Sequence, residues 1–145
     1  MHGSSLFAHG NFPTPDGLAQ MVPTPPRVND VDAKGMLKLN TGRIRDQWHT
    51  MTRTGRVPHL MTHASEPLLD IHPRDAAPRG LVDGALSKLE SEHGASVLRV
   101  HVTERQRPGE VFAPMHWTDR FSSAGPAGRL VTARTDPYSG QPDLK

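Results

Sequence analysis

Several short stretches of the chain alternate hydrophobic and polar residues with a period of two, which is typical of half-buried β-strands. The clearest is Ala95–Thr103, where Leu98, Val100 and Val102 are expected to face the core and the residues between them the solvent. Further strands are predicted at Met36–Asn40, Pro67–His72, Ala85–Glu92 and Glu110–Trp117, with a brief edge strand at Leu130-Val131. A turn signal at His93-Gly94 joins two of these strands into a hairpin. The pattern therefore predicts a mainly β protein.

Glycine and proline limit the predicted helices. With 13 glycines and 14 prolines among 145 residues, many turns and short elements are expected. One short helix is predicted to begin at Pro73 and to end at Gly80, and Pro78 inside it should keep it to one or two turns. A further helical turn is predicted near Asp46–Thr50. About six strands with one or two short helices favour a closed β-barrel, although strand propensity alone does not separate a barrel from a sandwich.

The first 30 residues are predicted to be separate from the main domain. Two short apolar pieces, Ser5–Ala8 and Leu18–Val22, flank a Pro-Asp-Gly turn inside Phe12–Gly17, which predicts a loose hairpin. The segment Pro23–Asp32 is proline-rich, and its prolines block a helix. The predicted domains are therefore residues 1–30, a hairpin with its linker, and residues 31–145, the main domain.

The composition indicates which partners the chain is expected to bind and in which compartment it is expected. The net charge is only +2, and most basic residues are arginines that occur singly, so nucleic acid is not expected as a partner. No cysteine is present, which excludes disulfides, thiolate metal sites and Fe–S clusters within this chain. No apolar run approaches the roughly 18 residues of a membrane helix, and no secretory signal is evident at the start. A soluble, cytoplasmic protein without a membrane partner is expected.

Familiar catalytic and metal-binding patterns are weak or missing. His59 and His63 have the spacing of two ligands on one helical turn, but Pro58 and Pro67 argue against a long helix there. No carboxylate or cysteine partner is obvious, so no metal ligand is predicted. No catalytic residue is predicted either. The chain also has no Gly-x-Ser-x-Gly, Walker or Gly-x-Gly-x-x-Gly motif.

The segment Asn40–Gly55 has the composition of a site for an anionic, aromatic ligand. Arg43 can hold a phosphate through two parallel hydrogen bonds, and Gly42 can let backbone N–H groups approach it. Trp48 offers a face for stacking on a heteroaromatic ring, and several threonines can make hydrogen bonds. The alternative interpretation is a solvated polar loop in which Trp48 closes one end of the core.

This segment also carries a family resemblance. Thr-Gly-Arg at 41–43, followed by Asp-Gln-Trp-His-Thr-Met-Thr-Arg-Thr-Gly at 46–55, resembles the cofactor loop of nitrate reductase catalytic subunits, in particular the assimilatory branch of the molybdopterin oxidoreductase family. Other pieces resemble the family in the same order along the chain: Phe12–Gly17, Ile71–Ala76, Asp83-Gly84, Pro108–Trp117 and the tail Asp136–Lys145.

The resemblance implies a fold, a cofactor and a set of ligand residues. The fold is a six-stranded double-psi β-barrel, and the cofactor is molybdenum bis(molybdopterin guanine dinucleotide). The implied cofactor-binding residues are Thr41, Gly42, Arg43, Gln47, Trp48, His49, Thr50, Thr52, Met115, His116, Gly128 and Lys145. Gly128 departs from the pattern, since related periplasmic enzymes carry an asparagine at this position or the next.

The resemblance also implies that the chain is a C-terminal domain cut away from a larger subunit that reduces nitrate to nitrite by oxygen-atom transfer. The partners would be the remaining domains, which would hold any Fe–S cluster, and the isolated domain would be inactive. The electron donor is not indicated. One alternative is the equivalent domain of a formate dehydrogenase or another molybdopterin oxidoreductase. An alternative of another class is a free-standing β-barrel that binds nucleic acid or a protein partner.

Overall fold

The computed structural model describes residues 7, 9–23, 25, 35–123, 126–137 and 139–141. The chain divides into two compact units, Met1–Asp32 and Ala33–Lys145. Every helix and strand found among the described residues belongs to the second unit.

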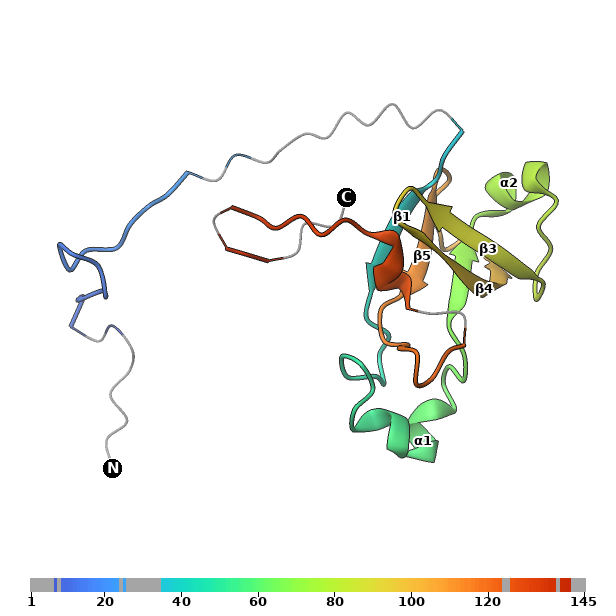
Figure 1. The fold of residues 1–145 in the computed structure, drawn as a ribbon, viewed down its shortest axis with the longest axis horizontal. Coiled ribbons are helices and arrows are strands. Elements are labelled where there is room, and N and C mark those ends of the chain that lie inside the picture. Colours follow the sequence, from blue (N-terminus) through green and yellow to red (C-terminus); the bar gives the residue numbers. More distant parts are fainter. Residues whose placement is uncertain are drawn as a thin grey trace. The chain divides into compact units, whose positions relative to one another are not determined.

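A five-stranded, curled sheet forms the second unit (Figure 1). Its strands, in chain order, are β1 (Lys38–Gly42), β2 (Leu68–Ile71), β3 (Leu86–Ser91), β4 (Gly94–Val102) and β5 (Glu110–Pro114). Their spatial order is β1-β5-β2-β4-β3. β1 is parallel to β5 and β2 is parallel to β4, whereas the β5–β2 and β4–β3 pairs are antiparallel. The prediction of a mainly β protein is confirmed.

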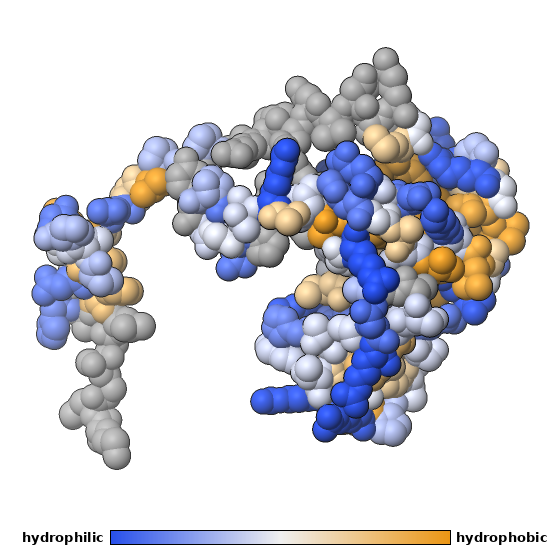
Figure 2. All heavy atoms as spheres, viewed as in Figure 1, coloured by the Kyte–Doolittle hydropathy of each residue, from blue (hydrophilic) through white to orange (hydrophobic). Residues whose placement is uncertain are grey.

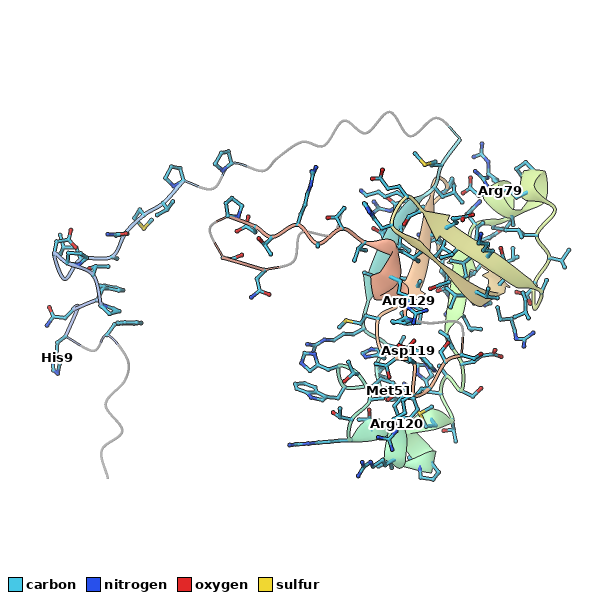
Figure 3. All side chains as sticks on the ribbon, viewed as in Figure 1. His9, Met51, Arg79, Asp119, Arg120 and Arg129 are labelled. Carbon is cyan, nitrogen blue, oxygen red and sulfur yellow. The ribbon has the colours of Figure 1, made fainter. Side chains whose placement is uncertain are left out.

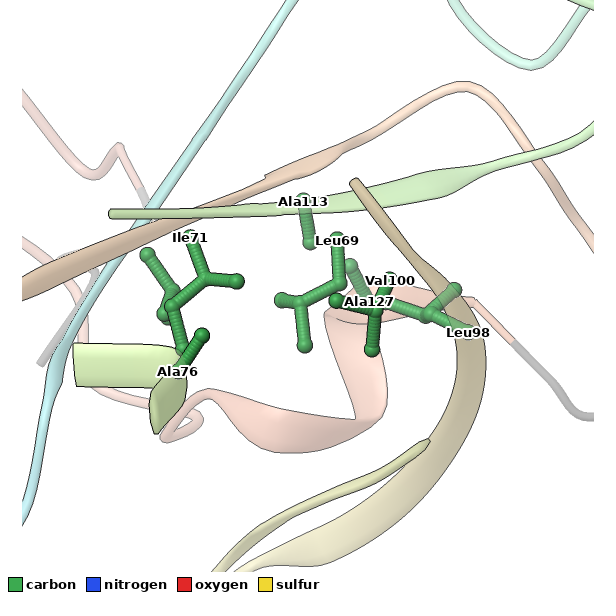
Figure 4. Close-up of a cluster of buried hydrophobic side chains, with 8 residues drawn as sticks. Leu69, Ile71, Ala76, Leu98, Val100, Ala113 and Ala127 are labelled. Carbon is green, nitrogen blue, oxygen red and sulfur yellow. The ribbon is translucent and has the colours of Figure 1, made fainter. Parts of the chain in front are cut away.

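The core lies against one face of this sheet, as the alternation in β4 predicts. Leu98 and Val100 are buried, while Val97 and His101 on the opposite face are exposed. Leu98 and Val100 pack with residues of neighbouring strands, and Figure 4 shows them beside Ala127. The other members of this core cluster are Leu69, Ile71, Ala76, Val111 and Ala113. Burying a side chain of this size contributes about 1.5–3 kcal/mol, so this cluster is the main source of stability.

The predicted helix after β2 is confirmed. α2 (Pro73–Ala76) continues into the 3-10 helix η2 (Ala77–Arg79). His72 caps its start, because the Nδ1 atom of the His72 ring accepts the N–H of Arg74 at 3.1 Å. Gly80 ends it in a left-handed conformation with φ of 64°, which glycine adopts without a steric cost.

Two predictions for the remaining segments are wrong. No helix forms at Asp46–Thr50, whose described backbone is turn and loop; the helical residues come later, in η1 (Thr54–Arg56) and α1 (Pro58–Met61). No strand forms at Leu130-Val131, because the residues before Val131 form a 3-10 helix, η3 (Ala127–Leu130). The six-stranded double-psi barrel is thus not confirmed by the described residues. Among the same residues, no helix is long and apolar enough to span a bilayer.

η3 takes the place of the expected edge strand because its residues pack on β4. Ala127 and Leu130 are buried, and the Oγ of Ser91 donates to the carbonyl of Leu130 at 2.8 Å. Gly94 permits this close approach, since a Cβ built there would lie 2.5 Å from the carbonyl oxygen of Arg129. η3 can therefore pack on β4 and bury its own apolar side chains there. A strand at this position would instead add to the edge of the sheet.

In the first unit, the described residues contain the predicted turn but no strand. The N–H of Phe12 donates to the carbonyl of Gly17 at 2.9 Å, and the N–H of Leu18 donates to Asp16 Oδ1 at 3.1 Å. This bond from Leu18 lowers the pKa of Asp16 below its usual value. Most of the expected Ser5–Ala8 strand lies outside the described residues.

A Gly94→Ala substitution should destabilise the 145-residue chain by about 1–3 kcal/mol, because the added methyl group forces η3 away from β4. Gly128→Ala is the matched control. No atom lies within 4 Å of a Cβ built at Gly128, so alanine there should be neutral or stabilising by up to about 1 kcal/mol. Urea unfolding of both variants measures the difference, and equal midpoints would contradict the packing of η3.

Candidate cofactor-binding site

Two loops meet at one edge of the sheet because β1 and β5 are parallel and in register. Gly42 pairs with Pro114, so both strands end at the same level. The pairing continues one residue further, where the N–H of Met115 donates to the carbonyl of Gly42 at 3.0 Å. The segments that follow, beginning at Arg43 and at Met115, therefore start side by side.

His116 holds the first of these loops from beneath. Its ring is fully buried, with 0% of the residue exposed. Nε2 accepts the N–H of Ile44 at 2.9 Å, and Nδ1 lies 2.6 Å from the carbonyl oxygen of His49. A carbonyl oxygen only accepts, so Nδ1 carries the proton and Nε2 does not. Because both ring nitrogens are engaged, His116 positions the loop and does not present a free nitrogen to a ligand.

Gln47 fixes the same loop to the helix that follows it. Only 6% of Gln47 is exposed. Its amide donates to the carbonyl of Leu60 at 3.1 Å, and its Oε1 accepts the hydroxyl proton of Thr54 at 2.7 Å. The Thr54 Oγ1 in turn accepts the N–H of Trp48 at 3.2 Å. Thr54 is a positioning residue that the sequence did not single out, since nothing in its surroundings distinguishes it from the other threonines.

The turn between Trp48 and Gly55 is tight and supported by apolar packing. His49 and Met51 both have positive φ angles, 37° and 58°, which is costly for residues with a side chain. The N–H of Met51 donates to the carbonyl of Trp48 at 2.8 Å, and the Met51 side chain is fully buried. A Cβ built at Gly55 would lie 2.9 Å from the ring of Phe121, so glycine is needed there for this packing.

The outer face of the loop carries a cation next to an aromatic surface. The guanidinium carbon of Arg43 lies 5.3 Å from the centre of the Trp48 ring, within range of a cation–π interaction. His49 contacts Trp48 edge-on, with ring centres 4.5 Å apart and an angle of 88°. Trp48 is nevertheless 51% exposed. It therefore does not close the core, and about half of its surface is open to solvent.

Of the two arginines at the start of the loop, only Arg45 is paired with a carboxylate. Arg45 makes two hydrogen bonds of 2.9 Å to Asp46, which lower the pKa of Asp46. His63 Nδ1 also approaches Asp46, at 3.3 Å. Arg43 has no such partner among the described residues. In that part of the chain, no three His, Cys, Asp or Glu side chains gather as a metal site would require.

Thr41, Gly42 and Met115 lie where the two strands end. Thr41 Oγ1 is the one buried side-chain oxygen, among the described residues, without a hydrogen-bond partner. Gly42 faces the ring of Phe112, which lies 3.2 Å from the position of a Cβ. Its role in the structure is therefore packing, in addition to any approach to a ligand. The Met115 side chain is exposed.

The remaining predicted residues are more scattered. Thr50 and Thr52 are exposed residues of the same loop. Gly128 is an exposed residue of η3, which packs on β4, so the described contacts place it with a different part of the sheet. Lys145 lies outside the described residues. The structure thus brings together eight of the predicted residues around one sheet edge: Thr41, Gly42, Arg43, Gln47, Trp48, His49, Met115 and His116.

Comparison with known families shows to which family the chain belongs. The family model described as "Molydopterin dinucleotide binding domain" matches residues 37–145. The chain belongs to the molybdopterin dinucleotide-binding domain family. The matched range covers all five strands and both loops of the site.

Three curated relatives of the chain are nitrate reductases. The chain is 48% identical to the nitrate reductase of Klebsiella oxytoca over 132 residues, which cover 90% of the chain and 15% of the relative. It is 32% identical to that of Shewanella frigidimarina, covering 97% and 17%, and 40% identical to that of Symbiobacterium thermophilum, covering 79% and 15%. The chain therefore spans about one sixth of the length of these relatives.

The fold is shared more widely. Acetylene hydratase from Pelobacter acetylenicus superposes with a TM-score of 0.64, over 77% of this chain and 17% of that one, at 21% sequence identity. Residues at the sheet edge also fit a dinucleotide cofactor. Among the described residues, Arg43 has no carboxylate partner, the indole of Trp48 is exposed, and the buried hydroxyl of Thr41 has no hydrogen-bond partner. These are the donors and surfaces that an anionic heteroaromatic ligand requires.

A His116→Ala substitution should destabilise the 145-residue chain by about 3–5 kcal/mol, because it empties a buried site and leaves the Ile44 N–H and the His49 carbonyl without partners. His101→Ala is the control. His101 is exposed and forms a surface pair with Asp70 at 2.9 Å, so its loss should cost less than about 1 kcal/mol. Urea unfolding is the measurement. Similar losses for both variants would show that His116 does not hold the loop.

Proposed function

We propose that this chain is the C-terminal domain of a nitrate reductase and binds molybdenum bis(molybdopterin guanine dinucleotide). The observation that carries the proposal is the 48% identity to the Klebsiella oxytoca nitrate reductase across 90% of the chain. The fold alone would not select this reaction, because acetylene hydratase has a similar domain.

The residues at the sheet edge have separate tasks in this proposal. Arg43 neutralises and orients a phosphate, and Trp48 provides a stacking surface beside it. The Thr41 hydroxyl gains the hydrogen-bond partner that it lacks among the described residues. Gln47 and His116 hold the loop in shape from the inside. The bound group supplies oxygen-atom transfer at molybdenum, and this domain supplies orientation and charge.

The proposal extends to the protein around this domain. The match to about one sixth of each relative supports a longer catalytic subunit, whose other domains would complete the site and carry any Fe–S cluster. We place this subunit in the cytoplasm and its role in nitrate assimilation, on the likeness of the loop at 46–55 to the assimilatory branch. The complete domain would be a six-stranded double-psi barrel, in which Lys145 also contacts the cofactor.

The activity is tested on the complete polypeptide that contains this sequence. The purified protein should contain molybdenum and pterin, release GMP on acid hydrolysis and reduce nitrate to nitrite with a low-potential dye as the electron source. It should not oxidise formate. A protein with cofactor that oxidises formate and leaves nitrate unchanged would replace the proposed activity with the alternative one, and a protein without pterin would overturn the cofactor assignment.

The loop assignment is tested by Arg43→Ala and Trp48→Ala in the same polypeptide. Each should weaken cofactor retention roughly 10- to 100-fold, the effect of losing a charged hydrogen bond or one stacked ring. Arg105→Ala is the matched control, because Arg105 is exposed in the turn before β5, at the opposite end of that strand. Molybdenum and pterin are measured after extensive dilution and gel filtration. Retention equal to that of the control would remove the loop from the site.

A further inference from the structure

Positive charge is concentrated in one part of this chain. Residues 43–63 contain four arginines, at 43, 45, 53 and 56, and one acidic residue, Asp46, giving a net charge of 4 − 1 = +3. The whole chain has a net charge of +2, so the other 124 residues sum to 2 − 3 = −1. Basic residues occur singly along the sequence. Positive charge is nevertheless in excess at the edge of the sheet that carries the cofactor loop.

Three arginines are close in sequence to one contact between two segments, that of Gly55 with Phe121. Arg53 is the N-cap residue of η1 and Arg56 is its last residue. Between them, Gly55 packs against the ring of Phe121. The guanidinium carbon of Arg120 lies 5.7 Å from the centre of that same ring. Arg53, Arg56 and Arg120 thus form the arginine surface, which two segments distant in sequence build together.

Figure 3 shows Arg120 beside Met51 and α1, below the Arg129–Asp119 pair. The same face carries a band of strongly hydrophilic residues in Figure 2. All three members of the arginine surface are exposed.

The charges of the arginine surface are not neutralised within the described residues. Arg45, Arg99 and Arg129 each form an ion pair, at 2.9, 2.8 and 2.8 Å. None of the three arginines of the surface does so with a described carboxylate. The acids nearest to these arginines in sequence are already engaged, Asp46 by Arg45 and Asp119 by Arg129. An exposed cluster of like charges without partners favours a ligand or protein surface of the opposite sign.

The chemistry around the arginines favours a protein partner. Val57 follows Arg56 directly and is 43% exposed, and the ring of Phe121 lies under Arg120. Arginine together with apolar groups is typical of protein–protein interfaces. A nucleic-acid site usually contacts about 6–10 phosphates, which is more than these three arginines can neutralise.

We propose that the arginine surface docks on an acidic surface of the remainder of the same polypeptide. The inference rests on the proposed function, in which this chain is one domain of a longer subunit. The chain matches only 15–17% of the length of its relatives, so in a protein of that length most of the polypeptide lies outside this domain and would supply the acidic surface. Docking beside the cofactor loop would close the dinucleotide between two domains.

Charge reversal in the complete polypeptide tests the docking. The variant Arg53→Glu/Arg56→Glu is compared with Arg105→Glu/Arg107→Glu, an equal charge change in the turn before β5. Limited proteolysis measures the rate at which a C-terminal fragment of this size is released. The reversal at η1 should increase that rate roughly tenfold, whereas the control should not, and Arg53→Gln/Arg56→Gln should give an intermediate rate. High salt should reduce the difference between the reversal and the wild type.

Other outcomes overturn the docking. A release rate equal to that of the control would show that these arginines contact no other domain. An unchanged rate with reduced molybdenum and pterin content would show that they bind the cofactor. Nucleic-acid binding by the wild type that the reversal abolishes would assign the surface to that ligand. A wild-type polypeptide with no pterin and no nitrate reduction would remove the proposed function, while the proteolysis rates would still report on the docking.

Discussion

The parallel pairing of β1 with β5 is the constraint on which the site depends. Parallel neighbours end at the same edge of a sheet, so the in-register pair Gly42–Pro114 brings two loops together that are far apart in the sequence. The bond from Met115 to Gly42 extends that pairing and places His116 directly under the first loop. A shift of one residue in this register would turn His116 away from Ile44 and remove the support of the loop.

Within the loop, some residues are buried and support the backbone, whereas their neighbours are exposed on the surface. Gln47 and Met51 point inward and are buried, whereas Trp48 between them is exposed. This division needs an irregular backbone, and His49 and Met51 adopt left-handed conformations to produce it. Such conformations cost about 1–3 kcal/mol each, which the buried hydrogen bonds and packing beneath the loop offset. The loop is thus held in shape before any ligand arrives.

Local patterns predicted the parts of the fold that depend on neighbours in sequence. The β3–β4 hairpin and the start of α2 at Pro73 follow from alternation and from proline and glycine chemistry. Long-range packing decided the rest. Leu130 was expected in a strand, but it is drawn into η3 because the backbone of η3 can approach β4 at Gly94. Similarly, a motif identified His116 as part of the site, but only its distances to Ile44 and His49 show that it acts from beneath.

Several polar and aromatic groups at one edge of the domain lack the partners that neighbouring groups have. Arg45 is neutralised by Asp46. Among the described residues, however, Arg43 has no carboxylate partner, the indole of Trp48 beside it is half exposed, and the buried hydroxyl of Thr41 has no hydrogen-bond partner. An anionic, aromatic ligand that binds only to the folded loop stabilises the folded loop by mass action. Binding of the proposed cofactor and folding of the loop should therefore be thermodynamically coupled. A change that strengthens the support beneath the loop should also strengthen retention of that ligand.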